Sequence, residues 1–113
     1  MIGKEKKTDV FKNRFGGEGE VVIEHIIDEA VYGGKVSLFT RCLLKPGCSL
    51  GYHEHKGNSE TYFILKGNPT YNDDGTLVEL KPGDTTFCPE GTSHGIANNM
   101  DSDVVFVAII VPA

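Results

Sequence analysis

Short segments rich in β-branched and aromatic residues run through most of this chain, and Gly, Pro, Asn or Asp bounds each of them. Such segments predict strands, here over residues 21–28, 36–44, 60–66, 76–80, 84–88, 93–97 and 104–111. No stretch keeps a helical period of apolar residues over three turns, although residues 10–15 fit either a strand or a helix. So many short strands within 113 residues predict a single all-β domain, folded as a sandwich or a barrel.

Two turn sequences support a fold made of similar halves. Lys45-Pro46-Gly47 and Lys81-Pro82-Gly83 each follow a leucine at the end of a predicted strand. Proline fixes φ at the second position of a turn and glycine supplies a positive φ at the third, as a type II turn requires. The segment 72–75, with the sequence Asn-Asp-Asp-Gly, predicts a hairpin turn. We therefore expect the segments after the two turns to enter the interior of one barrel in a similar way.

Composition excludes several classes of function. The net charge of −5 and the isoelectric point near 5.3 argue against nucleic acid as a partner, because phosphate binding needs clustered Lys and Arg. No apolar run approaches the roughly 20 residues of a membrane span, and no secretory signal segment is recognisable. Cys42, Cys48 and Cys88 form no CxxC pair, so reduced thiols are expected. The resulting prediction is a cytoplasmic protein without a membrane partner.

Three histidines and one glutamate form a pattern typical of a metal site. His53 and His55 alternate, so on a β-strand both would face one side, about 6.6–7 Å apart. Glu60 follows a loop of turn-forming residues, from which a returning antiparallel strand would bring its carboxylate to that face. His94 must arrive from elsewhere in the fold. Three imidazoles and one carboxylate suit one divalent Mn, Fe, Ni, Co, Cu or Zn ion as cofactor, and two coordination positions then stay open.

At these residues the sequence resembles the cupin superfamily. Its first motif, G(X)5HXH(X)3–4E(X)6G, and its second, G(X)5PXG(X)2H(X)3N, match all of their fixed positions here. The matching residues are Gly47, His53, His55, Glu60 and Gly67 in the first motif, and Gly83, Pro89, Gly91, His94 and Asn98 in the second. A lone HxH is weak, whereas ten spaced matches are a specific signal.

The resemblance implies a double-stranded β-helix, or jelly-roll barrel, over residues 21–113, with the metal held inside by His53, His55, Glu60 and His94. It also implies a homodimer, as is common for single cupins. Residues 1–20 would then be an N-terminal arm, in which residues 8–15 form an edge strand or a strand paired with the partner. Asn98 is expected to be a hydrogen-bonding corner residue, and His25, outside both motifs, a structural or surface residue.

Further side chains are candidates for the substrate site. By alternation from Glu60, Tyr62 and Ile64 are predicted to face the interior, and Ile96 to share the face of His94. Tyr62 would orient a substrate or donate a proton, although filling the barrel is the commoner role of an aromatic residue. Arg41 would bind a substrate carboxylate if it faced inward and would be a surface cation if it faced outward. Arg41, Ile64 and Ile96 are therefore the candidate substrate-binding residues.

Three functions fit this pattern. The leading hypothesis is a metal-dependent oxidoreductase, such as a dioxygenase, or a lyase that acts on a small organic acid or another polar metabolite. The alternatives are a non-catalytic module that binds a small ligand or metal, and a sugar isomerase or epimerase. Oxalate decarboxylases of the resembled family carry an arginine three residues before the first metal histidine, where this chain has Leu50. Leu50 therefore disfavours that activity.

Overall fold

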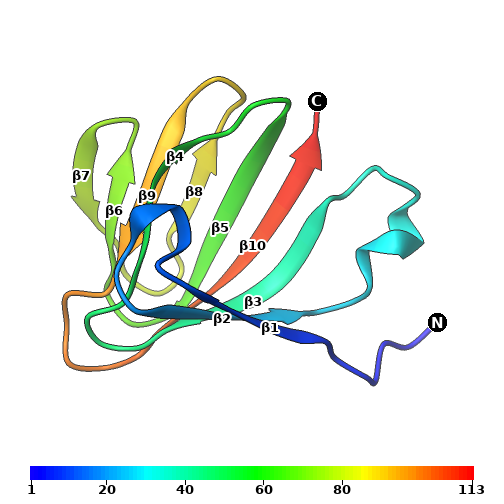
Figure 1. The fold of residues 1–113 in the computed structure, drawn as a ribbon, viewed down its shortest axis with the longest axis horizontal. Coiled ribbons are helices and arrows are strands. Elements are labelled where there is room, and N and C mark those ends of the chain that lie inside the picture. The colour runs from blue at the N-terminus through cyan, green and yellow to red at the C-terminus, as the bar shows by residue number, and fades with distance from the viewer.

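Ten β-strands and two 3-10 helices make up the regular structure in a computed structural model that describes residues 1–113 (Figure 1). In chain order they are β1 (Thr8–Lys12), η1 (Arg14–Gly16), β2 (Glu20–His25), η2 (Glu29–Tyr32), β3 (Leu38–Leu44), β4 (Ser49–Glu54), β5 (Asn58–Lys66), β6 (Thr70–Asp73), β7 (Thr76–Glu79), β8 (Thr85–Cys88), β9 (Ser93–Ala97) and β10 (Val104–Pro112). Neither helix is long and apolar enough to cross a membrane.

The strands form two antiparallel sheets that enclose the core. The six-stranded sheet has the order β1-β2-β3-β10-β5-β8, and the four-stranded sheet has the order β4-β9-β6-β7. From β3 onward the chain passes to the other sheet at every connection except the β6–β7 hairpin, so consecutive strands mostly lie in different sheets (Figure 1). The predicted all-β jelly roll is confirmed.

Most predicted strands are present, with ends that differ by a few residues. The prediction for residues 93–97 coincides with β9, and β2, β3, β5, β7, β8 and β10 overlap their predicted ranges. No predicted range covers β4, where a strand was assumed only for the alternation of His53 and His55. No strand was predicted at β6 either, which has only four residues, because the turn formers on both sides of it mask its alternation. The ambiguous segment 10–15 divides between the strand β1 and the turn η1.

The two Lys-Pro-Gly turns have the predicted conformation. Gly47 has a φ of 82° and Gly83 a φ of 94°, values that only glycine adopts without strain. The backbone N–H of Cys48 donates to the carbonyl of Lys45 at 3.0 Å, and Asp84 makes the same 3.0 Å bond to Lys81. Residues 74–75 close the hairpin between β6 and β7, as predicted, with positive φ at both positions.

Alternation within the strands fills the space between the sheets. In β5 the buried positions recur at every second residue from Glu60 to Ile64, whereas Phe63 and Leu65 face outward. The core consists of Val21, Cys42, Leu44, Leu50, Tyr62, Ile64, Tyr71, Leu80, Ile96, Val104, Phe106 and Ala108. Asn98 is fully buried at the corner after β9, where its side-chain amide donates to the carbonyls of Leu44 and Ser102 at 2.9 and 2.8 Å. Its expected structural role is confirmed.

The N-terminal strand β1 is the outer strand of the six-stranded sheet. It pairs with β2 of the same chain, from Thr8 opposite Glu24 to Lys12 opposite Glu20. The connecting turn η1, blue in Figure 1, folds back against β4 of the other sheet. The N-terminal arm therefore connects the two sheets at one end of the barrel.

His25 ties this arm to the rest of the sheet. Its ring lies between two carboxylates, with Nε2 2.8 Å from Asp9 Oδ2 and Nδ1 2.7 Å from Glu29 Oε2. Glu29 also accepts the backbone N–H of Phe39 at 3.0 Å. Burial by itself would lower the pKa of His25, but the hydrogen bonds to Glu29 and Asp9 outweigh it and raise the pKa. The expected structural role of His25 is thus confirmed.

This cluster makes stability depend on pH. A histidine whose pKa is raised by folding stabilises the protein below its ordinary pKa of 6.5, and this contribution disappears as the pH rises through the folded value. Burial would raise the pKa of Glu29, but hydrogen bonds from Phe39 and His25 lower it, so its contribution is present above its ordinary pKa of 4.5. The cluster should therefore stabilise most between those two values.

We expect His25→Gln to reduce the free energy of unfolding by about 1 kcal/mol at pH 5.5 and by clearly less at pH 8.5. Urea denaturation of chelator-treated protein at both pH values measures the two differences. Lys12→Gln is the control, because its ion pair with Glu20 is 3.8 Å long and exposed, and its effect should be near zero at both pH values. Equal losses for His25→Gln at the two pH values would contradict the prediction.

Candidate metal centre

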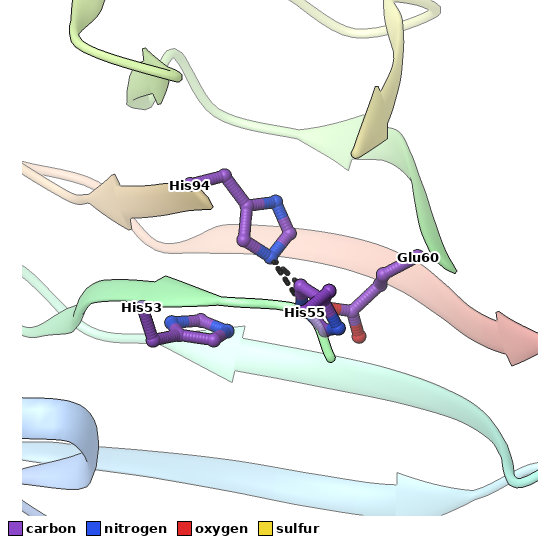
Figure 2. A group of neighbouring side chains, drawn as sticks. All are labelled: His53, His55, Glu60 and His94. Carbon is purple, nitrogen blue, oxygen red and sulfur yellow. Dashed lines mark hydrogen bonds and ion pairs between the residues drawn. The ribbon is translucent and has the colours of Figure 1, made fainter. Parts of the chain in front are cut away.

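Four predicted ligands meet inside the barrel. One ligand atom from each of His53, His55, Glu60 and His94 lies within 4.8 Å of the others, and Figure 2 shows the side chains converging from different strands. His55, Glu60 and His94 are buried, and His53 is partly exposed. The structure thus brings together a buried group of three histidines and one glutamate that suits a single metal ion.

Strand register determines how the ligands meet. His53 in β4 lies directly opposite His94 in β9, so both side chains leave the four-stranded sheet on its inner face. His55 follows immediately after β4 ends at Glu54. Glu60 differs from expectation, because its strand β5 pairs with β10 and β8 rather than returning along β4. Its carboxylate therefore reaches the centre from the facing sheet.

Three of the ligand atoms are within hydrogen-bond distance of one another. Nε2 of His94 lies 2.9 Å from Nε2 of His55 and 3.0 Å from Oε1 of Glu60, as the dashed lines in Figure 2 show. Nε2 of His55 lies 3.1 Å from the same Glu60 oxygen. A metal ion between them would replace these contacts with coordination bonds.

Each histidine is oriented by a hydrogen bond at its other ring nitrogen. Nδ1 of His53 donates to the carbonyl of Gly51 at 2.7 Å, and Nδ1 of His55 lies 2.7 Å from Oδ1 of Asn58. Nδ1 of His94 lies 2.8 Å from the hydroxyl of Tyr71. The partners of His53 and His55 are acceptor oxygens, so Nδ1 is the donor there and the Nε2 lone pair is directed to the centre; in His94 the contact of Nδ1 with the hydroxyl likewise leaves Nε2 facing the centre, as in metal-binding histidines. The donor set therefore fits a divalent transition metal.

The same geometry shifts the ionisation of these groups. Burial would raise the pKa of Glu60, but hydrogen bonds from His55 and His94 lower it, so the carboxylate is the form ready to bind a cation. Burial lowers the pKa of His53, which favours the neutral ring. The hydrogen bond to Glu60 raises the pKa of His55. As the pH falls, His55 becomes protonated, and a metal ion must then displace that proton in order to bind.

A cavity of about 180 Å³ opens onto the ligand group. Its wall is mainly apolar and includes Phe11, Ile23, Leu50, Phe106 and Ile110. The polar groups on the wall, apart from the ligands, are Asp9, Arg14, His25 and Tyr62. A few charged groups within an apolar wall are typical of a small-molecule site.

Tyr62 is among the residues that face this cavity. It is 1% exposed, and its ring stacks on His94 with the ring centroids 4.9 Å apart and an interplanar angle of 22°. Burial, followed by the nearby Glu60 charge, raises the pKa of Tyr62 well above its ordinary value. The hydroxyl therefore keeps its proton and is available as a hydrogen-bond donor.

The three predicted substrate-binding residues lie elsewhere. Arg41 is exposed on the outer face of β3, and Ile64 and Ile96 are packed in the core at 0% and 2% exposure, outside the cavity wall. Alternation placed Ile64 and Ile96 inside the barrel correctly, but packing against other core residues keeps them away from the cavity. For Arg41, the sequence did not show which face of β3 the side chain occupies, because the alternation of inward and outward residues cannot be followed through the Pro46-Gly47 turn.

Several residues of the site had no sequence signal that singled them out. Arg14 and Phe15 belong to the turn η1, and Phe15 stacks on His53 with centroids 3.8 Å apart. Tyr71 lies on β6, for which no strand was predicted, and Asn58 occupies a variable position of the first motif. Only Asn58, two residues before Glu60 in the segment predicted as a loop and observed as the start of β5, could have been suspected from its position.

Two antiparallel sheets around a group of three histidines and a glutamate define a cupin barrel with a candidate metal-binding site. The chain belongs to the cupin domain family, whose sequence model matches residues 40–110. That range contains all four candidate ligands.

The chain is similar to proteins of known sequence and of known structure. The oxalate-binding protein of Thermotoga maritima is 40% identical over 99 residues, which cover 88% of this chain and 82% of that protein. The crystal structure of a predicted oxalate decarboxylase from Thermotoga maritima superposes with a TM-score of 0.94 at 36% identity, over 100% of both chains. The polyketide cyclase RemF of Streptomyces resistomycificus, at 21% identity, has a TM-score of 0.77 over 99% of this chain and 77% of its own. This last likeness concerns the fold alone.

Proposed function

We propose that the chain binds one divalent transition metal through His53, His55, Glu60 and His94 and uses it to hold a small carboxylate such as oxalate. The observation that carries the proposal is the outward hydrogen bonding of all three Nδ1 atoms, which leaves three Nε2 atoms and one carboxylate around a common centre. The similarity to an oxalate-binding protein supports the choice of ligand.

The metal would coordinate oxygen atoms of the ligand, and the cavity would limit the size of the ligand. An ion with six coordination positions keeps two for oxygen atoms after four protein ligands have bound. The cavity volume of about 180 Å³ is close to the roughly 150 Å³ of a cavity that holds one benzene molecule. A ligand of six to eight non-hydrogen atoms, on the order of the size of benzene, is therefore the appropriate class, and larger sugars are disfavoured.

A catalytic role is the second candidate, because Tyr62 lines the cavity together with Glu60 and two of the ligand histidines. In metal-dependent oxidoreductase or lyase chemistry the Tyr62 hydroxyl would orient the bound acid by a hydrogen bond. Leu50 lines the cavity where the decarboxylases of the resembled family carry arginine, so oxalate decarboxylation is disfavoured. Binding without turnover and sugar isomerisation compete with this catalytic role.

Elemental analysis and calorimetry test the proposal. Protein purified with each candidate metal should contain one ion per chain, and the Mn-loaded protein should bind oxalate, whereas chelator-treated protein should not. Oxygen uptake and carbon dioxide release with oxalate then separate an enzyme from a binding module. Metal-loaded protein that binds no small carboxylate would reject the proposed function.

We further propose that the chain forms a homodimer through the outer face of its six-stranded sheet. Four apolar side chains on β5, β8 and β10 are between 42% and 58% exposed, namely Phe63, Leu65, Phe87 and Val111. Several exposed apolar side chains on the same three adjacent strands mark a candidate interaction surface. Sedimentation at micromolar concentration should give the mass of a dimer, and Phe63→Lys should lower it. A monomeric mass for the unaltered chain would contradict the proposal.

We also propose a cytoplasmic location, which the three free cysteines support, because reduced thiols are the rule in that compartment.

A further inference from the structure

The turn η1 presents an arginine to the metal cavity without a carboxylate partner. Arg14 lines the cavity together with His53, His55 and Glu60. Its guanidinium carbon lies 4.2 Å from the centroid of the Phe11 ring and 4.8 Å from that of Phe15. No acidic side chain of the chain is within ion-pair distance of it. The two rings pack against the guanidinium, which is exposed at the mouth of the cavity and has no protein acceptor for its N–H donors.

The turn that carries Arg14 is fixed against the metal site. Asn13 and Phe15 have φ values of 50° and 55°, a conformation that costs a non-glycine residue about 1–3 kcal/mol and persists only where surrounding contacts enforce it. Asn13 Nδ2 donates to the Gly17 carbonyl at 3.1 Å. A Cβ atom at Gly51 would overlap the carbonyl of Phe15, so glycine there allows the turn to lie directly on β4.

Contact with a ligand histidine completes this support. The Phe15 ring lies nearly parallel to His53, with centroids 3.8 Å apart and an interplanar angle of 16°. Gly51, against which the turn packs, accepts the Nδ1 proton of the same histidine at 2.7 Å. The contacts therefore hold the backbone of the turn, and with it the Cα atom of Arg14, at a defined position relative to the metal ligands.

The charges around the cavity leave Arg14 as its one unpaired side-chain charge. Asp9 is paired with His25 at 2.8 Å, and Glu60 is shared by His55 and His94. Three neutral imidazoles, one carboxylate and a divalent ion give the centre a net charge of about +1, by counting formal charges. Arg14 adds a second positive charge, so a dianion would neutralise the cavity and a monoanion would not.

We propose that Arg14 binds the carboxylate oxygens of a short dicarboxylate that face away from the metal, which makes it the residue that selects dicarboxylates over monocarboxylates. The inference rests on the proposed metal-dependent binding of a small carboxylate. The planar guanidinium offers paired N–H donors that match a carboxylate.

Calorimetric titration of Mn-loaded protein with oxalate, malonate and acetate tests this role. Arg14→Gln should weaken oxalate and malonate binding by about 10–100-fold, the usual range for a lost charge-assisted hydrogen bond, and change acetate binding by less than about threefold. Arg14→Lys should recover only part of the loss, because an ammonium group lacks the planar pair of donors. Arg41→Gln is the matched control on the outer face of β3 and should leave all three affinities unchanged.

Each other outcome has a definite meaning. If Arg14→Gln binds dicarboxylates as tightly as the unaltered chain, the role of Arg14 is overturned and the proposed function stands. If the unaltered Mn-loaded chain binds none of the three acids, the proposed function is overturned, and this inference falls with it. If Arg14→Gln and Arg14→Lys both lose the metal itself, Arg14 supports the turn rather than the ligand, which also overturns the inference.

Discussion

Replacing His53 by alanine is expected to abolish stoichiometric metal binding while leaving the barrel folded. His53 contributes an Nε2 atom to the ligand group and lies partly exposed at the cavity, so its truncation removes little core packing. Removing a residue that hydrogen-bonds to a metal ligand typically lowers metal affinity by about 10–100-fold. Removing the ligand itself should lower metal affinity by more than about 100-fold. Metal content after dialysis and far-ultraviolet circular dichroism measure the two effects.

His94→Ala should remove the metal equally but at a greater cost in stability. Its ring is 0% exposed and contacts Tyr62 and Tyr71. His25→Ala is the matched control, because His25 is the one histidine outside the ligand group, and the variant should keep one ion per chain. Full metal occupancy in either His53→Ala or His94→Ala would show that the ligand assignment is wrong.

A second large effect is expected in the core, at Leu44. This side chain is 0% exposed and belongs to the central cluster between the sheets. Leu44→Ala should reduce the free energy of unfolding by about 2–5 kcal/mol, because it removes buried surface and leaves a cavity. For a domain of this size that loss corresponds to a fall in Tm of roughly 15 °C. Urea and thermal denaturation of metal-loaded and chelator-treated protein measure it.

Leu77→Ala is the matched control for this core prediction. Leu77 lies on the outer strand β7 and is 69% exposed, so the same change of side chain should cost no more than about 0.5 kcal/mol. Similar losses at positions 44 and 77 would contradict the description of the core. A loss at Leu44 that appeared only in metal-loaded protein would instead link that residue to the metal site.

Much of the fold could be predicted because its signals are local. Alternation of apolar residues and the flanking turn formers located most strands, and β9 was predicted with its observed ends. The two Lys-Pro-Gly turns require only the dihedral preferences of proline and glycine, and both adopt the predicted conformation. The four-residue strand β6 escaped because so short a segment shows no alternation against its turn-rich flanks.

The surroundings of the ligand group could not be predicted. Arg41 and Arg14 are chemically alike, yet Arg14 lines the cavity because the turn η1 folds back onto β4. Tyr71 reaches His94 only because β6 pairs with β9. Glu60 approaches from the facing sheet because β5 pairs with β10 and β8. Each of these relations joins segments that are distant in the sequence.

The sequence by itself determined the donor types, their spacing, the turns and the alternation of the strands. These features depend on neighbouring residues and on backbone preferences, which any segment carries with it. The tertiary structure decided which side chains share the cavity, how each histidine is oriented, and that Arg14 stands beside the ligand group. Those outcomes depend on strand register between the sheets and on the packing of the N-terminal turn, and neither follows from the order of residues within one segment.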